Sequence, residues 1–200
     1  MTQNHALSIS VVMPAYKAEH LLPRVLAPLI TMLEAGEVQQ VLVVDDQSPD
    51  GTADLARKMG ATVLTTPVNG GPGAARNLAA EHATGDILWF VDSDVIAHSD
   101  GPTHVRRAMS EDNVAAVFGS YDDAPDGQAW FSRYKNLLHR YHHQRAKRDA
   151  RTFWAGCGAI RADVFREVGG FDVKTYEVPS IEDIELGYRI AATGRRIVVE

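Results

Sequence analysis

The sequence predicts a single α/β domain whose central sheet is mostly parallel and flanked by helices on both faces. Short apolar segments, too short for most helices, alternate along the 200 residues with segments of helical periodicity. Alternation at these lengths is typical of strands joined by helical crossovers. Polar or glycine-rich residues directly follow several of the apolar segments, where strands of an open α/β sheet usually present ligand-binding groups. We expect residues 1–100 to form one half of the domain and residues 101–200 the other.

The composition is that of an ordinary globular protein, with 45% hydrophobic and 23% charged residues. The single cysteine excludes an internal disulfide and fits a reducing compartment. No apolar stretch reaches 18 residues, and residues 1–5 are polar, so we expect neither a membrane span nor a signal peptide. These observations predict a cytoplasmic protein. The last residues are apolar, which leaves a continuation beyond residue 200 open.

Four strands and their connecting helices are predicted in the first half. Residues 8–13 form an apolar strand that we expect to end at Pro14, because proline lacks the N–H that a strand interior uses. Residues 21–34 have helical periodicity and are followed by glycine. Asp50 or Thr52 is expected to cap the next helix. Further strands are predicted at residues 41–44, 61–65 and 86–91, further helices at 53–59, 74–83 and 102–109, and a flexible loop at 69–73.

The second half is predicted to contain fewer strands and one strongly basic helix. Its elements are a strand at residues 114–119, an acidic loop at 122–127, a basic helix at 130–150, a strand at 152–160, helices at 161–168 and 181–192, and a strand at 195–199. Two glycines after residue 168 are expected to end the helix there. Glu185 and Arg189 have the spacing of an ion pair on the last helix.

Charge is unevenly distributed along the chain. The net charge is −6, but residues 130–151 contain seven Lys or Arg and one acid, so the remainder carries −12. Tyr134, Leu137, Leu138 and Tyr141 recur within this basic stretch at helical spacing. Such a face fits an anionic membrane or a lipid-phosphate acceptor, whereas a helix face in solvent is the alternative that we favour. A peripheral position at the inner face of the membrane therefore stays open.

Two aspartates, one residue apart, follow the predicted strand at residues 86–91. On a rigid strand end, Asp92 and Asp94 form a pair of oxygen ligands that suits Mg²⁺ or Mn²⁺ when phosphate oxygens complete the site. A solvated turn explains the same two residues equally well when they are considered alone.

Three other strand ends are predicted to lie at the same edge of the sheet. Tyr16 offers an aromatic face to a flat base, with half-buried packing as the alternative. Asp46 offers a carboxylate to a base N–H, whereas Asp45 is expected to bond loop N–H groups. The glycine-rich loop with Gly73, the helix that follows and Arg76 offer donors to a ribose or a phosphate. Four ends converging on one ligand favour a nucleotide site over four independent turns.

Two adjacent acids, Glu182 and Asp183, begin the last predicted helix. The spacing of Ser180 and Asp183 is that of a capping box, which is the ordinary structural explanation. An acid in this place, after a loop containing glycine and proline, is alternatively a candidate general base.

Five segments together carry a resemblance to a known family. They read V-V-M-P-A-Y, V-V-D-D-Q-S-P-D-G-T, G-G-P-G-A-A-R-N-L-A, F-V-D-S-D and I-E-D-I-E-L-G-Y-R, in this order along nearly the whole chain. In this set the sequence resembles family 2 glycosyltransferases with the GT-A fold. The resemblance implies a GT-A catalytic domain, Rossmann-like in its sheet, that acts as an inverting transferase. It also implies a nucleotide-activated sugar as donor and a divalent cation, Mn²⁺ or Mg²⁺, as cofactor.

The resemblance further implies roles for the matching positions. Pro14 and Tyr16 would border the base, and Asp46 would bind the edge of the base. Asp92 would contact the ribose or the water shell of the metal, and Asp94 would bind the metal directly.

The resemblance also implies a role for the last motif, and the sequence lacks two features that occur in members of the family. Asp183, beside Glu182, would be the general base that deprotonates the acceptor hydroxyl. Gln47 stands where the family more commonly has glycine, which changes the loop but removes no functional group. The Q-x-x-R-W motif of processive members does not occur in these 200 residues.

The acceptor and the donor nucleotide are predicted less sharply. Trp154 and Gly156 lie in a segment of aromatic and small residues that suits the floor of an acceptor pocket, with core packing as the alternative. UDP is the favoured donor nucleotide, and GDP and dTDP stay open. No nucleic-acid partner is expected, and the oligomeric state is left open. The competing functions are a nucleotidyltransferase that makes sugar nucleotides, a receiver-like signalling domain and a non-catalytic sugar-nucleotide-binding relative.

Overall fold

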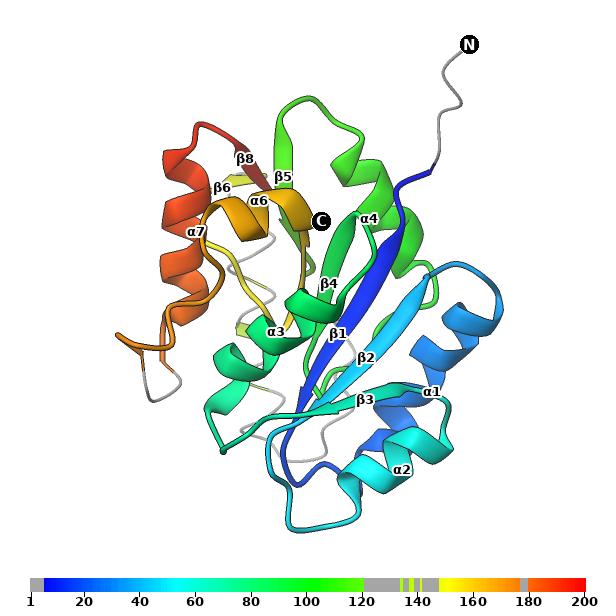
Figure 1. Cartoon of the computed structure of the whole chain (residues 1–200). Helices are drawn as coiled ribbons and strands as arrows, with labels where there is room; N and C mark the ends of the chain where they lie inside the picture. Colours follow the sequence, from blue (N-terminus) through cyan, green and yellow to red (C-terminus); the bar gives the residue numbers. More distant parts are fainter. Residues whose placement is uncertain (1–5, 121–133, 135–136, 139–140, 142–147, 177–179) are drawn as a thin grey trace.

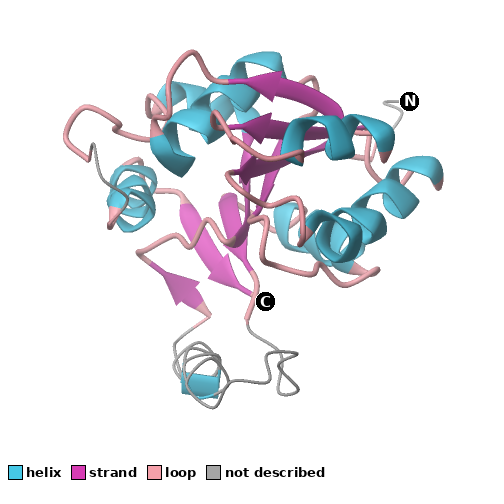
Figure 2. Ribbon diagram, turned by 90° about the horizontal axis from the view of Figure 1, so that it is seen from below, coloured by secondary structure: helices cyan, strands magenta, loops and turns pink. Residues whose placement is uncertain are grey.

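The computed structural model describes residues 6–120, 134, 137, 138, 141, 148–176 and 180–200 of the chain. Within these residues the chain forms an eight-stranded sheet with helices on both faces, which confirms the predicted α/β fold (Figures 1 and 2). In spatial order, the strands are β3 (Thr62–Thr65), β2 (Gln40–Asp45), β1 (Ile9–Ala15), β4 (Ile87–Val91), β7 (Cys157–Arg161), β5 (Val114–Phe118), β8 (Arg196–Val199) and β6 (Asp149–Ala150).

Two layers of helices cover the sheet, because alternate side chains of a strand point to opposite faces. On one face, Val11 and Met13 of β1 pack in a core with the helices α1 (Leu22–Glu34), α2 (Thr52–Lys58) and α4 (Gly101–Met109). On the other face, Val12 packs in a core with the helices α3 (Gly71–His82), α6 (Ala162–Glu167) and α7 (Glu182–Ala192). Both faces of the central strands are therefore buried, as their continuous apolar sequences predict.

The first four strands bring their carboxyl ends to one edge of the sheet. β1 pairs in parallel with both β2 and β4, and β2 pairs in parallel with β3. The loops after β1, β2 and β4 carry Tyr16, Asp46 and Asp92 to this edge. The predicted convergence of these strand ends is thus confirmed.

The second half of the sheet is less parallel than predicted. β7 is antiparallel to both β4 and β5, and β6 is antiparallel to β8, whereas β5 and β8 are parallel. The register pairs Val91, at the end of β4, with Cys157, at the start of β7. Residues 152–156, predicted as part of the strand, instead precede it and lie at the carboxyl edge of β4. The reversed direction of β7 therefore delivers these residues to the same edge as Asp92.

The expectation that Pro14 ends the first strand is wrong, because β1 continues through Pro14 to Ala15. The carbonyl of Ala15 accepts a hydrogen bond from the N–H of Asp46, on the β2 side. Since neighbouring residues of a parallel strand bond to opposite sides, the backbone of Pro14 faces the β4 side. The pairing of β1 with β4 ends at Val12, so no donor is needed at Pro14.

Two predicted helix starts also differ from the structure. Helix α3 begins at Gly71, inside the segment predicted as a flexible loop. Helix α2 has Gly51 at its N-cap, so neither Asp50 nor Thr52 takes that position, but Oδ1 of Asp50 accepts the N–H of Thr52, the first residue of the helix, at 3.2 Å. The Thr52 hydroxyl instead accepts a hydrogen bond from the N–H of Ala18 at 2.9 Å, which ties α2 to the loop after β1.

The acidic loop and most of the basic helix predicted between residues 122 and 150 lie outside the described residues. Tyr134, Leu137, Leu138 and Tyr141 are described, and they are helical and exposed. Residues 149–150 form the strand β6 rather than the end of a helix. In the part of the chain that the structure covers, no helix has the length and apolarity that crossing a bilayer requires.

Helix α7 contacts the backbone of the segment before β7 through a glycine. A Cβ atom placed on Gly187 would lie 2.3 Å from the backbone nitrogen of Phe153 and 2.6 Å from the carbonyl carbon of Thr152. Both atoms belong to the backbone, so they cannot move away from a new side chain by a change of rotamer. The absence of a side chain at Gly187 therefore allows α7 to lie directly against residues 152–153.

We predict that Gly187→Ala destabilises the protein. In an unconstrained helix this substitution stabilises by about 1 kcal/mol, because alanine has the higher helix propensity. Here the clash with the backbone of Phe153 should lower the free energy of unfolding by about 1–3 kcal/mol. Urea denaturation followed by circular dichroism measures the change. A gain in stability would show that the helix is not in close contact with residues 152–153.

Candidate functional site

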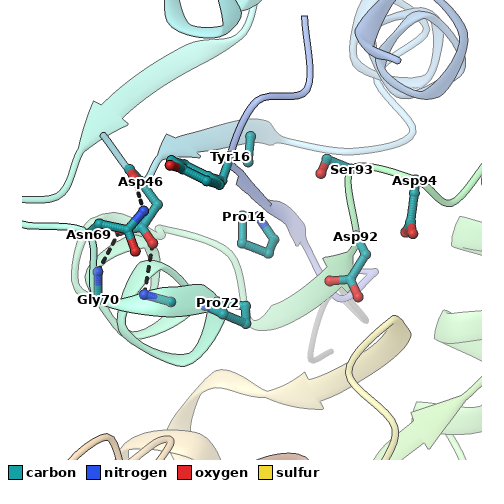
Figure 3. Close-up of a pocket in the computed structure, with 11 residues that line it drawn as sticks. Pro14, Tyr16, Asp46, Asn69, Gly70, Pro72, Asp92, Ser93 and Asp94 are labelled. Carbon is teal, nitrogen blue, oxygen red and sulfur yellow. Dashed lines mark hydrogen bonds between the residues drawn. The ribbon is translucent and has the colours of Figure 1, made fainter. Parts of the chain in front are cut away.

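A cavity of about 440 Å³ opens at the carboxyl edge of the parallel strands. A volume of this size is typical of small-molecule sites. Its two ends differ in chemistry, with Tyr16 and Asp46 at one end and Asp92 and Asp94 at the other (Figure 3). The residues that line it are Pro14, Ala15, Tyr16, Asp46, Asn69, Gly70, Gly71, Pro72, Asp92, Ser93 and Asp94. The end of β1, the end of β2, the start of α3 and the end of β4 thus form one site.

Asp46 is fixed by three hydrogen-bond donors. Its Oδ1 accepts from the hydroxyl of Thr66 at 2.6 Å. Oδ1 also accepts from the N–H of Gly70 at 3.0 Å, and Oδ2 accepts from the N–H of Gly71 at 2.7 Å (Figure 3). Two of these donors lie at the start of α3, where N–H groups lack a partner within the helix. The side chain is buried, with an exposed fraction of 4%, so only a small part of it faces the cavity.

The residues around Asp46 shape the same end of the cavity. Asp45 points its carboxylate at the N–H of Ser48, at 3.3 Å, which confirms the structural role expected for it. Gln47 has a φ of +63° and donates its side-chain amide to the carbonyl of Thr66. This left-handed backbone explains why glycine would suit the position. Asn69, which the sequence did not single out, donates to the backbone carbonyl of Asp46 at 2.9 Å.

At the opposite end, Asp92 and Asp94 bring two carboxylates together. Partial burial in the cavity wall raises the pKa of Asp94, and the negative charge of Asp92 raises it further. A cation beside the pair would offset this repulsion. Among the described residues no group of three or more His, Cys, Asp or Glu side chains could hold a metal ion. Two carboxylates therefore fit a cation that takes its remaining ligands from phosphate oxygens and water.

Arg76 lies behind the cavity wall rather than in it. Its guanidinium is buried, donates to Oδ1 of Asp92 and stacks over the ring of Phe171 at 5.4 Å. Gly73 is likewise absent from the cavity lining, and a Cβ atom placed on it would lie 3.3 Å from a methyl group of Val173. Arg76 therefore orients Asp92, and Gly73 allows α3 to approach residues 171–173. Direct contact of either residue with a nucleotide stays a prediction.

Asp183 lies outside the cavity lining but is joined to it by a short segment. Its Oδ2 accepts from the N–H of Ala155 at 3.3 Å, and the carbonyl of the adjacent Gly156 accepts from the N–H of Asp92 at 2.9 Å. Burial raises the pKa of Asp183, while the N–H groups of Ala155 and Ile184 oppose this effect. A partly desolvated carboxylate of this kind is a stronger base than an exposed aspartate.

The capping-box explanation for Asp183 is wrong. Helix α7 has Ile181 at its N-cap, and no side chain caps it. Glu182 is buried and accepts the N–H of Ser180 at 2.8 Å, and its side chain packs near Gly73 of α3. Of the two adjacent acids, Asp183 is therefore the one turned toward residues 155–156.

The two residues predicted for the acceptor, Trp154 and Gly156, flank Ala155, whose N–H donates to Asp183. A Cβ atom placed on Gly156 would lie 3.4 Å from Oδ2 of Asp92, so the glycine leaves the space beside that carboxylate open. Trp154 is partly buried and packs against the core that contains α7. This placement agrees with both an acceptor floor and core packing, and the role of the two residues stays a prediction.

Known proteins resemble this chain in sequence and in fold. Residues 10–169 match the family described as glycosyl transferase family 2. Over 117 residues the chain is 28% identical to the UDP-Glc:alpha-D-GlcNAc-diphosphoundecaprenol beta-1,3-glucosyltransferase WfgD of Escherichia coli, covering 57% of this chain and 46% of that protein. The chain spans about half or less of the length of the curated relatives that it matches.

Two solved structures share the fold. The mannosyltransferase PcManGT from Pyrobaculum calidifontis, in complex with GDP-Man and Mn²⁺, has a TM-score of 0.76 at 21% identity and covers 98% of this chain and 55% of that chain. TarS 1-349 from S. aureus, in complex with UDP-GlcNAc, has a TM-score of 0.73 at 23% identity and covers 97% of this chain and 56% of that chain. At these identities the likeness concerns the fold alone.

We predict that Asp46→Asn destabilises the protein. The amide has one acceptor oxygen in place of two, so at least one donor among Thr66, Gly70 and Gly71 loses its partner. The free energy of unfolding should fall by about 1–3 kcal/mol. Urea denaturation measures this change, with Asp54→Asn as control, because Asp54 is exposed and pairs only with Arg57 among the described contacts. Equal stability of the two variants would contradict the anchoring role of Asp46.

Proposed function

The chain belongs to glycosyl transferase family 2, and from this we propose that it transfers a sugar from a nucleoside diphosphate sugar to an acceptor hydroxyl. The observation that carries this proposal is the two-ended cavity. One end has an exposed tyrosine ring and a carboxylate for a base, and the other has two carboxylates for a metal-bound diphosphate. Both ends lie at the edge where open α/β sheets bind ligands.

Membership in this family excludes two of the three competing functions. A nucleotidyltransferase and a receiver domain are different families, and the match over residues 10–169 is to neither. A relative that binds a sugar nucleotide without catalysis is excluded only by an assay of sugar transfer.

The donor would lie along the cavity, with its base between Pro14, Tyr16 and Asp46 and its diphosphate near Asp92 and Asp94. A divalent cation bound to Asp94, with Asp92 beside it, would supply positive charge against the charge that grows on the diphosphate as the sugar leaves. Mn²⁺ and Mg²⁺ both suit carboxylate and phosphate oxygens. Arg76 supports this end by holding Asp92 from behind.

The acceptor would be activated by Asp183. Its carboxylate would take the proton of the acceptor hydroxyl while the oxygen attacks the anomeric carbon on the face opposite the diphosphate. That carbon develops oxocarbenium character, as in glycoside hydrolysis. Attack from the opposite face inverts the configuration of the sugar. The support for this assignment is the path from Asp183 through Ala155 and Gly156 to Asp92.

We also propose that the acceptor is linked to a lipid and that the protein works at the surface of a membrane. The name of the Escherichia coli relative specifies a diphosphoundecaprenol acceptor. In this chain, Tyr134, Leu137, Leu138 and Tyr141 are exposed, helical and spaced to share one face. They lie within the basic stretch of residues 130–151, which suits anionic lipid. The expectation of a cytoplasmic location stays a prediction.

A thermal-shift panel tests the donor class. UDP-, GDP-, dTDP- and CMP-sugars would be added to the protein with and without Mn²⁺. A ligand that binds only the folded state raises the melting temperature. We expect stabilisation by one nucleotide class and a larger shift when Mn²⁺ is present. If no sugar nucleotide shifts the melting temperature under either condition, the proposed function is wrong.

We predict that Asp94→Ala removes the effect of Mn²⁺ on nucleotide binding. The variant loses the carboxylate that we assign to the metal, while the base end of the cavity is unchanged. The thermal shift with nucleotide and Mn²⁺ should fall to the value seen without the metal. Asp100→Ala is a matched control, since this exposed aspartate lies outside the cavity. An undiminished effect of Mn²⁺ in Asp94→Ala would place the metal elsewhere.

We predict that Asp183→Asn abolishes transfer while the protein still folds and binds the donor. Loss of a general base should lower kcat by about 10²–10⁴-fold, measured as nucleoside diphosphate released from the stabilising donor. The amide oxygen can still accept the N–H of Ala155, whereas the N–H of Ile184, which donates to Oδ1 at 2.8 Å, loses that partner. Because the folded-state pKa of Asp183 is raised, its ionised form costs stability above that pKa, so removing the charge should offset part of this loss at pH 7.

A control and a pH profile complete this test. Asp163→Asn is the matched control, because Asp163 also follows the first residue of its helix and accepts the N–H of the next residue at 2.8 Å. It should keep full activity. In the wild type, activity should fall as the pH decreases through the pKa of Asp183, above the ordinary value of 3.8. Near wild-type transfer by Asp183→Asn would refute the assignment of the base.

A further inference from the structure

The carboxylate at the base end of the cavity has nearly all of its acceptor positions filled by the protein. A carboxylate offers about four lone-pair positions, two on each oxygen. Oδ1 of Asp46 uses both of its positions, for the Thr66 hydroxyl and the Gly70 N–H. Oδ2 uses one, for the Gly71 N–H. One position on Oδ2 is left for a ligand, in agreement with the 4% exposed fraction of Asp46.

The three protein donors are held in place by other bonds. Gly70 and Gly71 lie at the start of helix α3, so their N–H directions are set by the helix. Thr66 is buried, and its own N–H donates to the carbonyl of Asp45 at 3.1 Å. Its carbonyl accepts the side-chain amide of Gln47. A ligand in the cavity therefore binds a carboxylate whose three protein donors are fixed in position.

The nucleobases differ in how many donors they present to such a group. Uracil and thymine present one ring N–H between two carbonyl oxygens. Guanine presents a ring N–H beside an amino group, and this pair needs one acceptor on each carboxylate oxygen. Cytosine and adenine present an amino group beside a ring nitrogen whose lone pair would face the carboxylate. A single free position fits a single N–H, and a donor buried without an acceptor weakens binding.

Asn69 adds a group that suits the same bases. Its side-chain nitrogen carries two hydrogens, and one of them is used by the backbone carbonyl of Asp46 at 2.9 Å. Asn69 lines the cavity next to Asp46 (Figure 3), so we expect its second hydrogen to be available to a carbonyl oxygen of the base. Uracil and thymine carry such an oxygen on each side of their N–H.

We infer that the donor nucleotide carries uracil or thymine rather than guanine, cytosine or adenine. This inference rests on the proposed function, since it concerns the base of the same donor. The shared fold does not decide the base, because one solved neighbour is in complex with GDP-Man and the other with UDP-GlcNAc. The number of open positions on Asp46, set by Thr66, Gly70 and Gly71, decides it in this chain.

Isothermal titration of the whole chain with UDP, dTDP, GDP, CDP and ADP in the presence of Mn²⁺ tests the inference. Leaving one donor of guanine unpaired, or opposing a lone pair to the carboxylate, should weaken binding by about tenfold or more. UDP or dTDP should therefore bind at least about tenfold more tightly than the other three. The separate titrations of UDP and dTDP also show whether the 5-methyl group is accepted.

The variant Thr66→Ala tests the cause of the preference. Alanine lacks the hydroxyl and leaves its space empty, so one position on Oδ1 of Asp46 becomes free. With one position open on each oxygen, guanine can be bound, and the preference for UDP over GDP should shrink by about tenfold. Thr65→Ala is the matched control, because Thr65 is exposed and, among the described residues, the hydroxyl bonded to Asp46 is that of Thr66. Its preference should equal that of the wild type.

The outcomes separate this inference from the proposed function. Binding of GDP as tight as that of UDP or dTDP in the wild type would overturn the inference and leave a sugar-nucleotide enzyme. A wild-type preference that persists unchanged in a folded Thr66→Ala variant would overturn the role of the filled acceptor positions. Failure of every nucleotide to bind, with and without Mn²⁺, would overturn both the inference and the proposed function.

Discussion

The relation between the two halves of this protein depends on one short peptide segment. The carbonyl of Gly156 accepts the N–H of Asp92, and the N–H of Ala155 donates to the carboxylate of Asp183. Two consecutive residues therefore hold the backbone of Asp92 on one side and the carboxylate of Asp183, the candidate base, on the other. This arrangement exists because β7 runs antiparallel to β4, which places the residues before β7 at the carboxyl edge of the sheet. A parallel β7 would carry the segment to the opposite edge.

A second set of contacts, made by the helices α3 and α7, also holds Asp92 and Asp183 in place relative to each other. Arg76 of α3 holds Asp92, and its neighbour Asn77 exchanges two hydrogen bonds, of 2.9 and 2.8 Å, with the backbone of Phe171. Arg189 of α7 donates at 2.7 Å to the carbonyl of the residue before Phe171. Helix α7, whose second residue is the candidate base Asp183, is thus tied to helix α3, whose first residues line the cavity. Such doubly supported geometry is what a site needs to keep reacting groups in position.

Local sequence patterns predicted the first half of the fold and the ends of the cavity. Tyr16, Asp46 and Asp92 follow parallel strands, and that order along the chain is enough to bring them together. The direction of β7 and the role of Thr66 could not be predicted, because an apolar pattern does not encode strand direction and the Thr66 hydroxyl meets Asp46 only in the folded chain. The strand β1 can include Pro14 because its pairing with β4 ends at Val12, so no backbone N–H is needed at Pro14. The sequence of one strand does not reveal where its neighbour stops.

The measurement that tests the central claim most directly is a crystal structure of the protein with UDP and Mn²⁺, read by the anomalous signal of manganese. We predict a single strong peak bound by a carboxylate oxygen of Asp94 and by the diphosphate. The base should lie against Tyr16 with its N–H on Oδ2 of Asp46. A manganese peak away from Asp94, or a nucleotide bound outside the cavity, would contradict the account of this site.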